Sequence, residues 1–304
     1  MEGNVQRWIQ QRGWDRAAEH YQRFWRDQLR PAHEAILAAA ALNAGERVID
    51  VACGTGMVTL PAARAVGPRG TVLATDIAQR MVDDTARRAA EWSLANVKVE
   101  RRDAEDLGPR EGFDVALCSL GLMYVPTPAT ALAEIVRVLR PGGRFVAAVW
   151  GERRNCGWAE IFPIVEARVA SDVCPLFFRC GAPGTLAELF RRAGLVDVDE
   201  RRIAAELVYD DGAAAIGAAF LGGPVALAHA RFDAATRESA YAEYLTSIEA
   251  FRDGTGYRVP GEFVVVAGRT PGTGDPPLQP PTTTTLYDHR PPTTNHQLTP
   301  AQRS

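Results

Sequence analysis

Apolar and polar positions between residues 46 and 150 follow two alternating patterns. Short runs of mostly apolar, often β-branched residues are typical of strands that are covered on both faces. Between these runs apolar residues recur every three or four positions, which predicts helices that pack on a sheet. Because strands and helices are expected to alternate five times, the order predicts a parallel sheet with helices on both faces. The predicted strands are Arg47 to Ala52, Thr71 to Asp76, Asn96 to Arg102, Phe113 to Ser119 and Arg144 to Trp150.

Two further strands and several helices are expected outside this region. Leu195 to Ile203 and Glu262 to Gly268 are apolar or alternating runs, and they predict a sixth and a seventh strand. A helix from Thr185 to Gly194 is predicted to begin with a capping box between Thr185 and Glu188. Residues 211–253 are rich in alanine and are expected to be helical.

The chain divides into four predicted parts, which differ in composition. Residues 1–45 are interpreted as a helical cap, and residues 46–151 as a ligand-binding core. Residues 152–270 supply lid and substrate segments and the remaining core strands. Residues 271–304 are rich in Pro and Thr and cannot bury enough apolar surface to fold, so this tail is predicted to be disordered.

The first predicted strand runs into a glycine-rich turn that opens a helix. Gly54 and Gly56 let the backbone approach a ligand closely, and the N-terminus of the helix favours a nucleotide-like group. The dinucleotide fingerprint requires a third glycine, but Thr59 stands at that position. Asp76 ends the second strand 20 residues beyond Gly56, where an acid that binds a ribose is expected.

The run Asp50-Val-Ala-Cys-Gly-Thr-Gly56, followed by Asp76, resembles the class I methyltransferases that use S-adenosylmethionine. Three later motifs extend the resemblance over residues 46–151: Asp103 after the third strand, Phe113-Asp114 at the fourth, and Leu139-Arg-Pro-Gly-Gly143 before the fifth. The last wording is typical of the branch of methyltransferase type 11 and quinone-biosynthesis enzymes. The resemblance implies a Rossmann-like α/β fold of seven mostly parallel strands, the last one antiparallel, with a helical lid.

The resemblance also implies roles for individual residues toward S-adenosylmethionine. Gly54 and Gly56 would face the methionine moiety, with Asp50 orienting its amino group, and Asp76 would accept from the ribose hydroxyls. Ile77 would pack on the adenine, and Asp103 with Ala104 would bind its amino group. Ser119 and Leu120 would line the mouth through which the methyl group is transferred. The expected cofactor-binding residues are Asp50, Ala52, Cys53, Gly54, Gly56, Asp76, Ile77, Asp103, Ala104, Ser119 and Leu120.

Methyl transfer requires alignment and exclusion of water more than a catalytic triad, and no triad is evident. A general base would help a hydroxyl or an acidic carbon, and His20 and Tyr21 are the candidates. Two other functions stay open. A Rossmann-type NAD-dependent oxidoreductase is disfavoured by Thr59 and by Lys98 being the only lysine. A non-catalytic S-adenosylmethionine-binding protein is disfavoured by the retained acids Asp76 and Asp103.

The composition of the chain limits the classes of partner, cofactor and substrate that it is expected to bind. The net charge of −3 gives no basic field for nucleic acid, and no run reaches the length of a membrane span. The five cysteines form no framework, which favours reduced thiols and a cytoplasmic protein, and the five histidines have no metal-ligand spacing. The apolar, aromatic lid favours a small, partly hydrophobic acceptor, with aromatic and quinone-like compounds among the candidates. The sequence does not distinguish C-, O- and N-methylation and leaves the oligomeric state open.

Overall fold

One mixed sheet organises the chain. The structure, a computed structural model, describes residues 2–169 and 177–275. Seven strands lie in the order β3-β2-β1-β4-β5-β8-β6, and the two-residue strand β7 pairs with β8 outside this path. The strands are β1 Arg47–Val51, β2 Thr71–Asp76, β3 Val97–Arg101, β4 Phe113–Ser119, β5 Leu139–Trp150, β6 Val196–Tyr209, β7 Arg252–Asp253 and β8 Gly256–Arg269.

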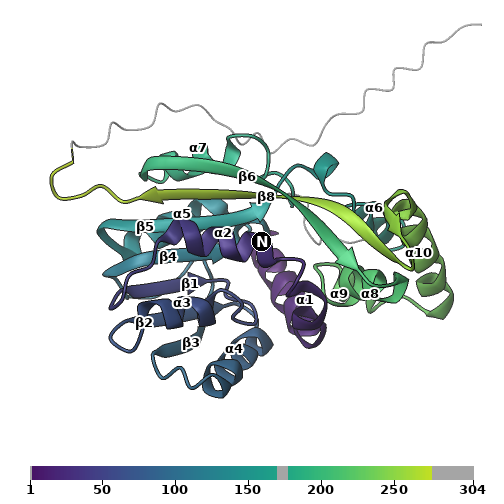
Figure 1. Ribbon diagram of the computed structural model, residues 1–304, viewed down its shortest axis with the longest axis horizontal. Coiled ribbons are helices and arrows are strands. Elements are labelled where there is room, and N and C mark those ends of the chain that lie inside the picture. Colours follow the sequence, from purple (N-terminus) through teal and green to yellow (C-terminus); the bar gives the residue numbers. More distant parts are fainter. Residues whose placement is uncertain (1, 170–176, 276–304) are drawn as a thin grey trace, which may run out of the picture.

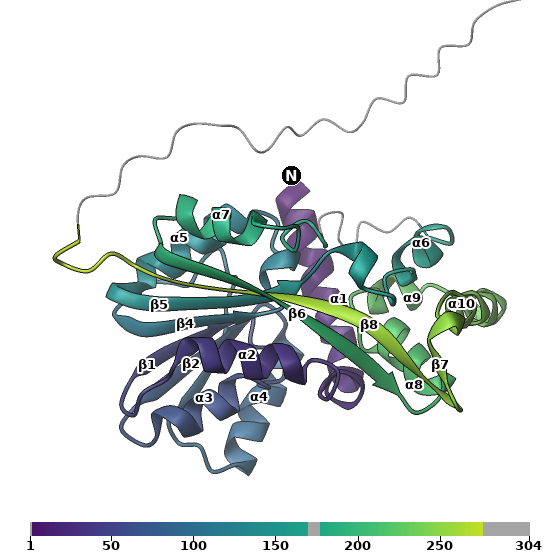
Figure 2. The same ribbon diagram turned by 45° about the horizontal axis from the view of Figure 1, so that its top comes forward.

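Strands β1 to β5 are parallel, and β8 runs antiparallel to both of its neighbours, β5 and β6. The central residues of β1, β2, β4, β5 and β8 are almost completely buried, because helices cover both faces of the sheet: α2, α3 and α4 on one and α5 and α7 on the other (Figures 1 and 2). The expected α/β fold with an antiparallel last strand is therefore confirmed. These helices are α2 Arg30–Ala40, α3 Thr59–Val66, α4 Gln79–Glu91, α5 Pro128–Val138 and α7 Thr185–Arg192.

The last two long strands extend well beyond the lengths that the sequence predicted. β6 and β8 continue past the sheet as a two-stranded ribbon, and they carry the chain to a group of helices at one end of the molecule (Figures 1 and 2). This group consists of α6 Ile161–Glu166, α8 Gly212–Ile216, the π-helix η3 Gly217–Leu221, α9 Ala226–His229 and α10 Ala234–Ser247. Burial alternates along the ribbon part of β6, but apolar Ala204 and Val208 stand at exposed positions, and the ribbon part of β8 contains Pro260 and Gly261. The sequence pattern therefore marked only about half of each strand.

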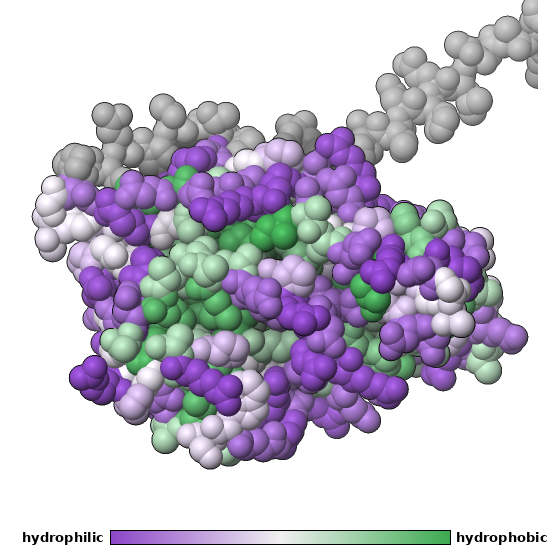
Figure 3. Space-filling model, in the orientation of Figure 1, coloured by the Kyte–Doolittle hydropathy of each residue, from purple (hydrophilic) through white to green (hydrophobic). Residues whose placement is uncertain are grey.

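Strand β6 forms one edge of the sheet, and its charged side chains protect that edge. The run Asp197 to Arg202 places acidic and basic residues along the strand. Figure 3 shows hydrophilic residues as a band along this edge, with more apolar residues below it in the region of the alanine-rich helix α2. Charges on an edge strand discourage pairing with another chain.

Two local expectations are wrong. No helix connects β3 to β4: residues 102–112 contain Gly108, Pro109 and Gly112 and form turns with one isolated bridge, Asp103 to Asp106. The capping box at Thr185 is also absent, because Gly184 is the N-cap, with a φ of 72° and no side-chain hydrogen bond. Of the predicted tail, residues 276–304 lie outside the described residues, as do residues 170–176 of the predicted lid.

Helix α1 (Glu2–Trp25) is a single long helix that lies across the carboxyl ends of the parallel strands. It packs against α4 of the core and against α9 and η3 of the terminal helix group. It therefore joins the two ends of the molecule and closes the edge of the sheet where a ligand of this fold binds. In the described part of the chain no helix is long and apolar enough to cross a membrane.

Candidate active site

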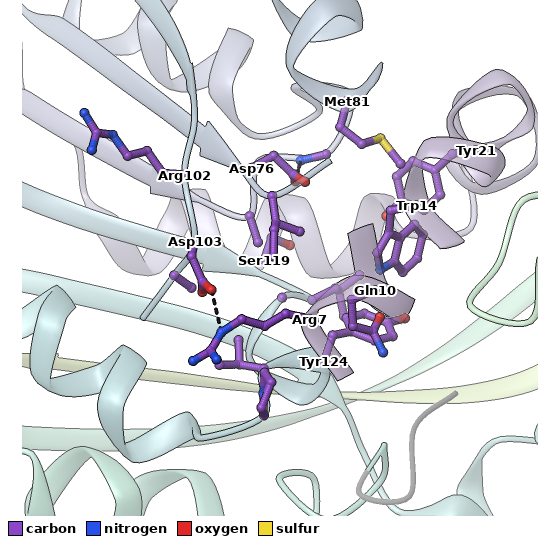
Figure 4. Close-up of a pocket in the computed structure, with 18 residues that line it drawn as sticks. Arg7, Gln10, Trp14, Tyr21, Asp76, Met81, Arg102, Asp103, Ser119 and Tyr124 are labelled. Carbon is purple, nitrogen blue, oxygen red and sulfur yellow. Dashed lines mark hydrogen bonds and ion pairs between the residues drawn. The ribbon is translucent and has the colours of Figure 1, made fainter. Parts of the chain in front are cut away.

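A cleft with about 710 Å³ of empty volume lies between α1 and the carboxyl ends of the parallel strands. Figure 4 shows Asp76 and Ser119 on the strand side, facing Trp14 and Tyr21 from α1. Nine of the residues singled out from the sequence line this cleft: Tyr21, Ala52, Gly54, Asp76, Ile77, Asp103, Ala104, Ser119 and Leu120. Three predicted ligand contacts do not line it: Asp50, Cys53 and Gly56.

Asp76 is held in place by two backbone N–H groups. Gly54 N–H donates to Oδ2 and Ala78 N–H donates to Oδ1, each at 2.9 Å, so the carboxylate fixes both the glycine turn and the start of α4. Burial raises the pKa of Asp76 to about 6, against the opposing effect of these donors. The carboxylate is thus positioned at the cleft by two backbone N–H groups.

Asp50 lies behind the glycine turn and is only 1% exposed. The Thr59 hydroxyl donates to Asp50 Oδ2 at 2.5 Å, while Oδ1 has no partner among the described residues. Burial raises the pKa of Asp50 to about 7. The threonine that breaks the dinucleotide fingerprint therefore has a structural role, which is to bind the acid of the first strand.

The glycine turn is held against α4 by side chains of that helix. The Thr85 hydroxyl donates to the Gly54 carbonyl at 2.7 Å, and Arg88 donates to the Thr55 carbonyl. Gly54 and Gly56 have φ values of 55° and 80°, a region that favours glycine. A Cβ on Gly56 would also lie 3.0 Å from the Thr85 methyl group, so Gly56 serves this packing and does not face the cleft.

Ala52 and Leu120 follow strands β1 and β4, and both line the cleft in a left-handed conformation, with φ values of 57° and 58°. Such a conformation is uncommon for residues other than glycine and occurs where surrounding structure enforces it. Gly121 makes room for this arrangement, because a Cβ there would lie 2.5 Å from the Ala52 Cβ. Ala52 and Gly121 are therefore a matched pair at the floor of the cleft.

One face of α1 supplies the opposite wall. Arg7, Gln10, Trp14 and Tyr21 are three, four and seven positions apart, which places them on the same side of the helix. Arg7 Nε pairs with Asp103 Oδ2 at 2.7 Å (Figure 4), and the same guanidinium pairs with Glu105. The sequence reasoning missed Arg7 and Gln10, although their spacing from Trp14 and Tyr21 was a usable signal. It also missed Met81, Arg102, Gly121, Val125 and Pro126 as lining residues.

The two candidate bases, His20 and Tyr21, point from α1 into different cavities. Tyr21 lines the cleft, whereas its neighbour His20 lines a different, more polar cavity together with His229 and Arg237. Consecutive residues of a helix point about 100° apart, so both cannot face one ligand. Burial and the charge of Asp76 raise the pKa of Tyr21 above its ordinary value. His20 thus lies outside the cleft and Tyr21 lines it, and a general base at either residue stays a prediction.

Comparison with known proteins identifies the chain as similar to methyltransferases. Residues 48–143 match the family described as methyltransferase domain. The chain is 34% identical over 201 residues to nocamycin O-methyltransferase of Saccharothrix syringae, covering 61% of this chain and 72% of that protein. It is 31% identical over 174 residues to demethylmenaquinone methyltransferase of a Geobacillus species, covering 51% of this chain and 73% of that protein.

Solved structures show the same fold at low sequence identity. The protein YcgJ of Bacillus subtilis has a TM-score of 0.56 at 17% identity, with 80% of this chain and 99% of that chain covered. Phosphoethanolamine N-methyltransferase 2 of Haemonchus contortus, solved with S-adenosyl-L-methionine, has a TM-score of 0.56 at 15% identity, with 84% of this chain and 57% of that chain covered.

Fold, strand order and a cleft with acids at successive strand ends define a class I S-adenosylmethionine-dependent methyltransferase. The chain belongs to this family, in the branch that resembles menaquinone-biosynthesis enzymes. The cleft residues fit the cofactor: Asp76 and Asp103 offer acceptors, and the buried Ser119 hydroxyl has no partner among the described residues. Prior expectations of this family, of methyl transfer and of S-adenosylmethionine as cofactor are confirmed.

Affinity for S-adenosylhomocysteine is expected to fall as the pH drops through 6. A carboxylate accepts from ligand hydroxyls best when it is ionised, and the raised pKa of Asp76, about 6, makes its protonation accessible. Binding at pH 5 should be about tenfold weaker than at pH 7, as one linked proton requires. Calorimetry from pH 5 to pH 8 measures the change in affinity, and Asp50→Asn is the control that retains the inflection near pH 6.

The stability of the free protein should follow the opposite trend. It should fall as the pH rises toward 7, because folding favours protonated Asp50 and Asp76.

Proposed function

We propose that the protein transfers a methyl group from S-adenosylmethionine to a small, partly hydrophobic acceptor, of an aromatic or quinone-like kind. The observation that carries this proposal is the aromatic wall of the cleft. Trp14 contacts Tyr21 and Tyr124 edge to face, with ring centroids 5.5 and 5.0 Å apart. Its relatives include enzymes named for nocamycin, demethylmenaquinone and aklanonic acid, which supports the same acceptor class.

We assign the cofactor contacts by position along the cleft. Asp76 would accept from the two ribose hydroxyls, since both of its oxygens are already oriented by backbone donors. Asp103 and Ala104 would bind the adenine amino group, and Ile77 would pack on the ring. Gly54 and Ala52 would face the methionine part, with Ser119 and Leu120 near the transferred methyl group.

Asp50 and Cys53 lie behind the residues that line the cleft. Asp50 would stabilise the turn through Thr59 without contacting the cofactor. The Cys53 N–H donates to the Thr75 carbonyl at 2.9 Å, which ties the turn to β2. These two residues and Gly56 are thus assigned to shaping the turn.

Methyl transfer requires that the protein align the acceptor with the methyl group of the cofactor. The cofactor supplies a methyl group activated by its bond to a positively charged sulfur. A lone pair of the acceptor forms a bond to the methyl carbon, the carbon–sulfur bond breaks with its electrons going to sulfur, and the acceptor loses a proton. Alignment and desolvation of this kind contribute on the order of 7–11 kcal/mol. Because Tyr21 stays protonated, it would orient the acceptor and exclude water, and the proton would leave to solvent or to a group of the acceptor.

The Arg7 ion pairs suggest how the cleft closes. Arg7 links α1 to Asp103 and Glu105 across the adenine end, so α1 acts as a cover that the cofactor must displace or slide beneath. We include helix α1 in the cofactor site for this reason. We also propose a cytoplasmic location, since the four described cysteines, Cys53, Cys118, Cys156 and Cys180, are free thiols, as a reducing compartment favours.

Methyl transfer is expected with oxygenated aromatic acceptors. Incubation with methyl-labelled S-adenosylmethionine and a panel of hydroxynaphthoquinones, phenols and amines should release S-adenosylhomocysteine and label an aromatic acceptor. The Asp76→Asn variant serves as the negative control. Release without an acceptor, or labelling of amines only, would contradict the proposed acceptor class, and binding of the cofactor with no transfer to any compound would favour the non-catalytic alternative.

A further inference from the structure

The glycine turn between β1 and α3 is not fixed by its own sequence. Gly54 and Gly56 flank Thr55, and glycine has more conformational freedom to lose on folding than any other residue. Contacts from outside the turn therefore determine its shape. Two of them come from α4, where the Thr85 hydroxyl and the Arg88 guanidinium donate to backbone carbonyls of the turn. A third contact comes from α1, the helix that covers the cleft.

Gln22 of α1 accepts two hydrogen bonds beside this turn. Its Oε1 accepts from the Thr55 hydroxyl at 2.8 Å and from Arg88 Nη1 at 2.8 Å. Arg88 also donates to the Thr55 carbonyl, so the three residues form one closed network. Thr55 is only 1% exposed, and its hydroxyl therefore has little access to water. Through one oxygen atom, Gln22 connects the cover of the cleft, the turn and α4.

The network requires an acceptor at position 22. A guanidinium has only donors, and a carbonyl oxygen with two lone pairs accepts from Arg88 and from the Thr55 hydroxyl at once. An apolar side chain there would leave a buried hydroxyl without its partner, which costs free energy. The neighbouring Tyr21 lines the cleft, and a Cβ on Gly54 would lie 3.6 Å from its Cε1. Adjacent residues of α1 thus contact the turn, Tyr21 by packing and Gln22 by hydrogen bonds.

We propose that Gln22 is a positioning residue for the cofactor, because it holds the glycine turn in the shape that binds the methionine part of S-adenosylmethionine. The inference rests on the proposed assignment of Ala52 and Gly54 to that part of the cofactor. Gln22 is not among the residues that line the cleft, so it acts through Thr55. Its loss should weaken binding of the methionine part, and the affinity for adenosine alone should change less.

Titrations with S-adenosylhomocysteine and with adenosine separate the two parts of the cofactor. Gln22→Met keeps the length of the side chain, but its thioether is only a weak acceptor. Its preference for S-adenosylhomocysteine over adenosine, measured by calorimetry, should fall by about fivefold or more, as expected for the loss of one or two hydrogen bonds. Gln22→Glu should restore the preference, since a carboxylate accepts from both donors. Gln11→Met makes the same substitution elsewhere on α1, away from the cleft lining, and should behave as the wild type.

An unchanged preference in Gln22→Met would overturn the proposal. An equal loss of affinity for both ligands would also overturn it, because that result indicates a general effect on the fold. If Gln22→Met does not fold, Thr55→Val decides, since it removes the same hydrogen bond from the other side at nearly the same volume. A wild-type preference in folded Thr55→Val would contradict the role of Gln22.

The wild-type protein separates a failure of this inference from a failure of the proposed cofactor contacts. If it binds adenosine as tightly as S-adenosylhomocysteine, the glycine turn does not bind the methionine part, and the role of Gln22 falls with that assignment. If it prefers S-adenosylhomocysteine and Gln22→Met keeps that preference, only the role of Gln22 is wrong. These titrations need no methyl acceptor, so their result is independent of the proposed acceptor class.

Discussion

Replacing Asp76 by asparagine is expected to weaken S-adenosylhomocysteine binding by about a hundredfold or more. The carboxylate would accept two ribose hydroxyls, and each charge-assisted hydrogen bond contributes about 1.5–3 kcal/mol. The asparagine keeps the size of the side chain but loses its charge and one acceptor, so Gly54 N–H or Ala78 N–H also loses its partner. Isothermal titration calorimetry at pH 8, where Asp76 is ionised, measures the change.

Asp83→Asn is the matched control for this experiment. Asp83 lies on the exposed side of α4 and accepts a hydrogen bond from Gln79 at 2.8 Å, away from the cleft. Its variant should bind with wild-type affinity. Melting temperatures of both variants without cofactor show whether the fold is retained. An Asp76→Asn protein that is folded and binds as tightly as the wild type would show that the ribose contact is assigned to the wrong residue.

Replacing Gly121 by alanine is expected to destabilise the protein by about 1–3 kcal/mol, the usual cost of overpacking a buried site. The φ of Gly121 is −100°, which any residue adopts, so the cost arises from space alone. Its new Cβ would lie 2.5 Å from the Ala52 Cβ and 2.9 Å from Cys118 Sγ. Chemical denaturation measures the free energy of unfolding, and calorimetry measures the accompanying loss of cofactor affinity.

The double variant Ala52→Gly with Gly121→Ala tests whether the two residues are coupled. Removing the Ala52 methyl group eliminates the shortest contact and also relieves the left-handed backbone strain at residue 52. Most of the stability lost in Gly121→Ala should therefore return, which is a non-additive result for two residues in contact. Gly274→Ala, whose Cβ would meet nothing within 4 Å, is the neutral control. Additive effects would mean that Ala52 and Gly121 are not coupled at the floor of the cleft.

The core of the fold could be predicted because its signals are local. Strands β1, β2 and β4 and the second half of β5 are short runs in which apolar residues predominate, and the helices between most of the strands repeat apolar residues every three or four positions. The acids at positions 76 and 103 could be found for the same reason, since Asp76 ends β2 and Asp103 lies two residues after β3, and the fold fixes the direction of both strands.

The parts of the fold and of the site that could not be predicted depend on contacts between distant parts of the chain. Arg7 meets Asp103 only because α1 folds back across the sheet, and the sequence gives no signal for that pairing. Asp50, Cys53 and Gly56 belong to the recognised motif, but only packing against α3 and α4 shows that they support the turn from behind. Trp158, in the segment after β5, packs against Trp25 of α1 and Trp150 of β5, so the burial of its N–H, which is unpaired among the described residues, is visible only in three dimensions.

Titration of the wild-type protein with S-adenosylhomocysteine and, separately, with NAD tests the central assignment most directly. Both ligands carry an adenosine whose ribose could reach Asp76, but Thr59 replaces the glycine that the dinucleotide fingerprint requires. We expect one S-adenosylhomocysteine to bind per chain and NAD to give no measurable heat at the same concentrations. Tighter binding of NAD than of S-adenosylhomocysteine would contradict the account.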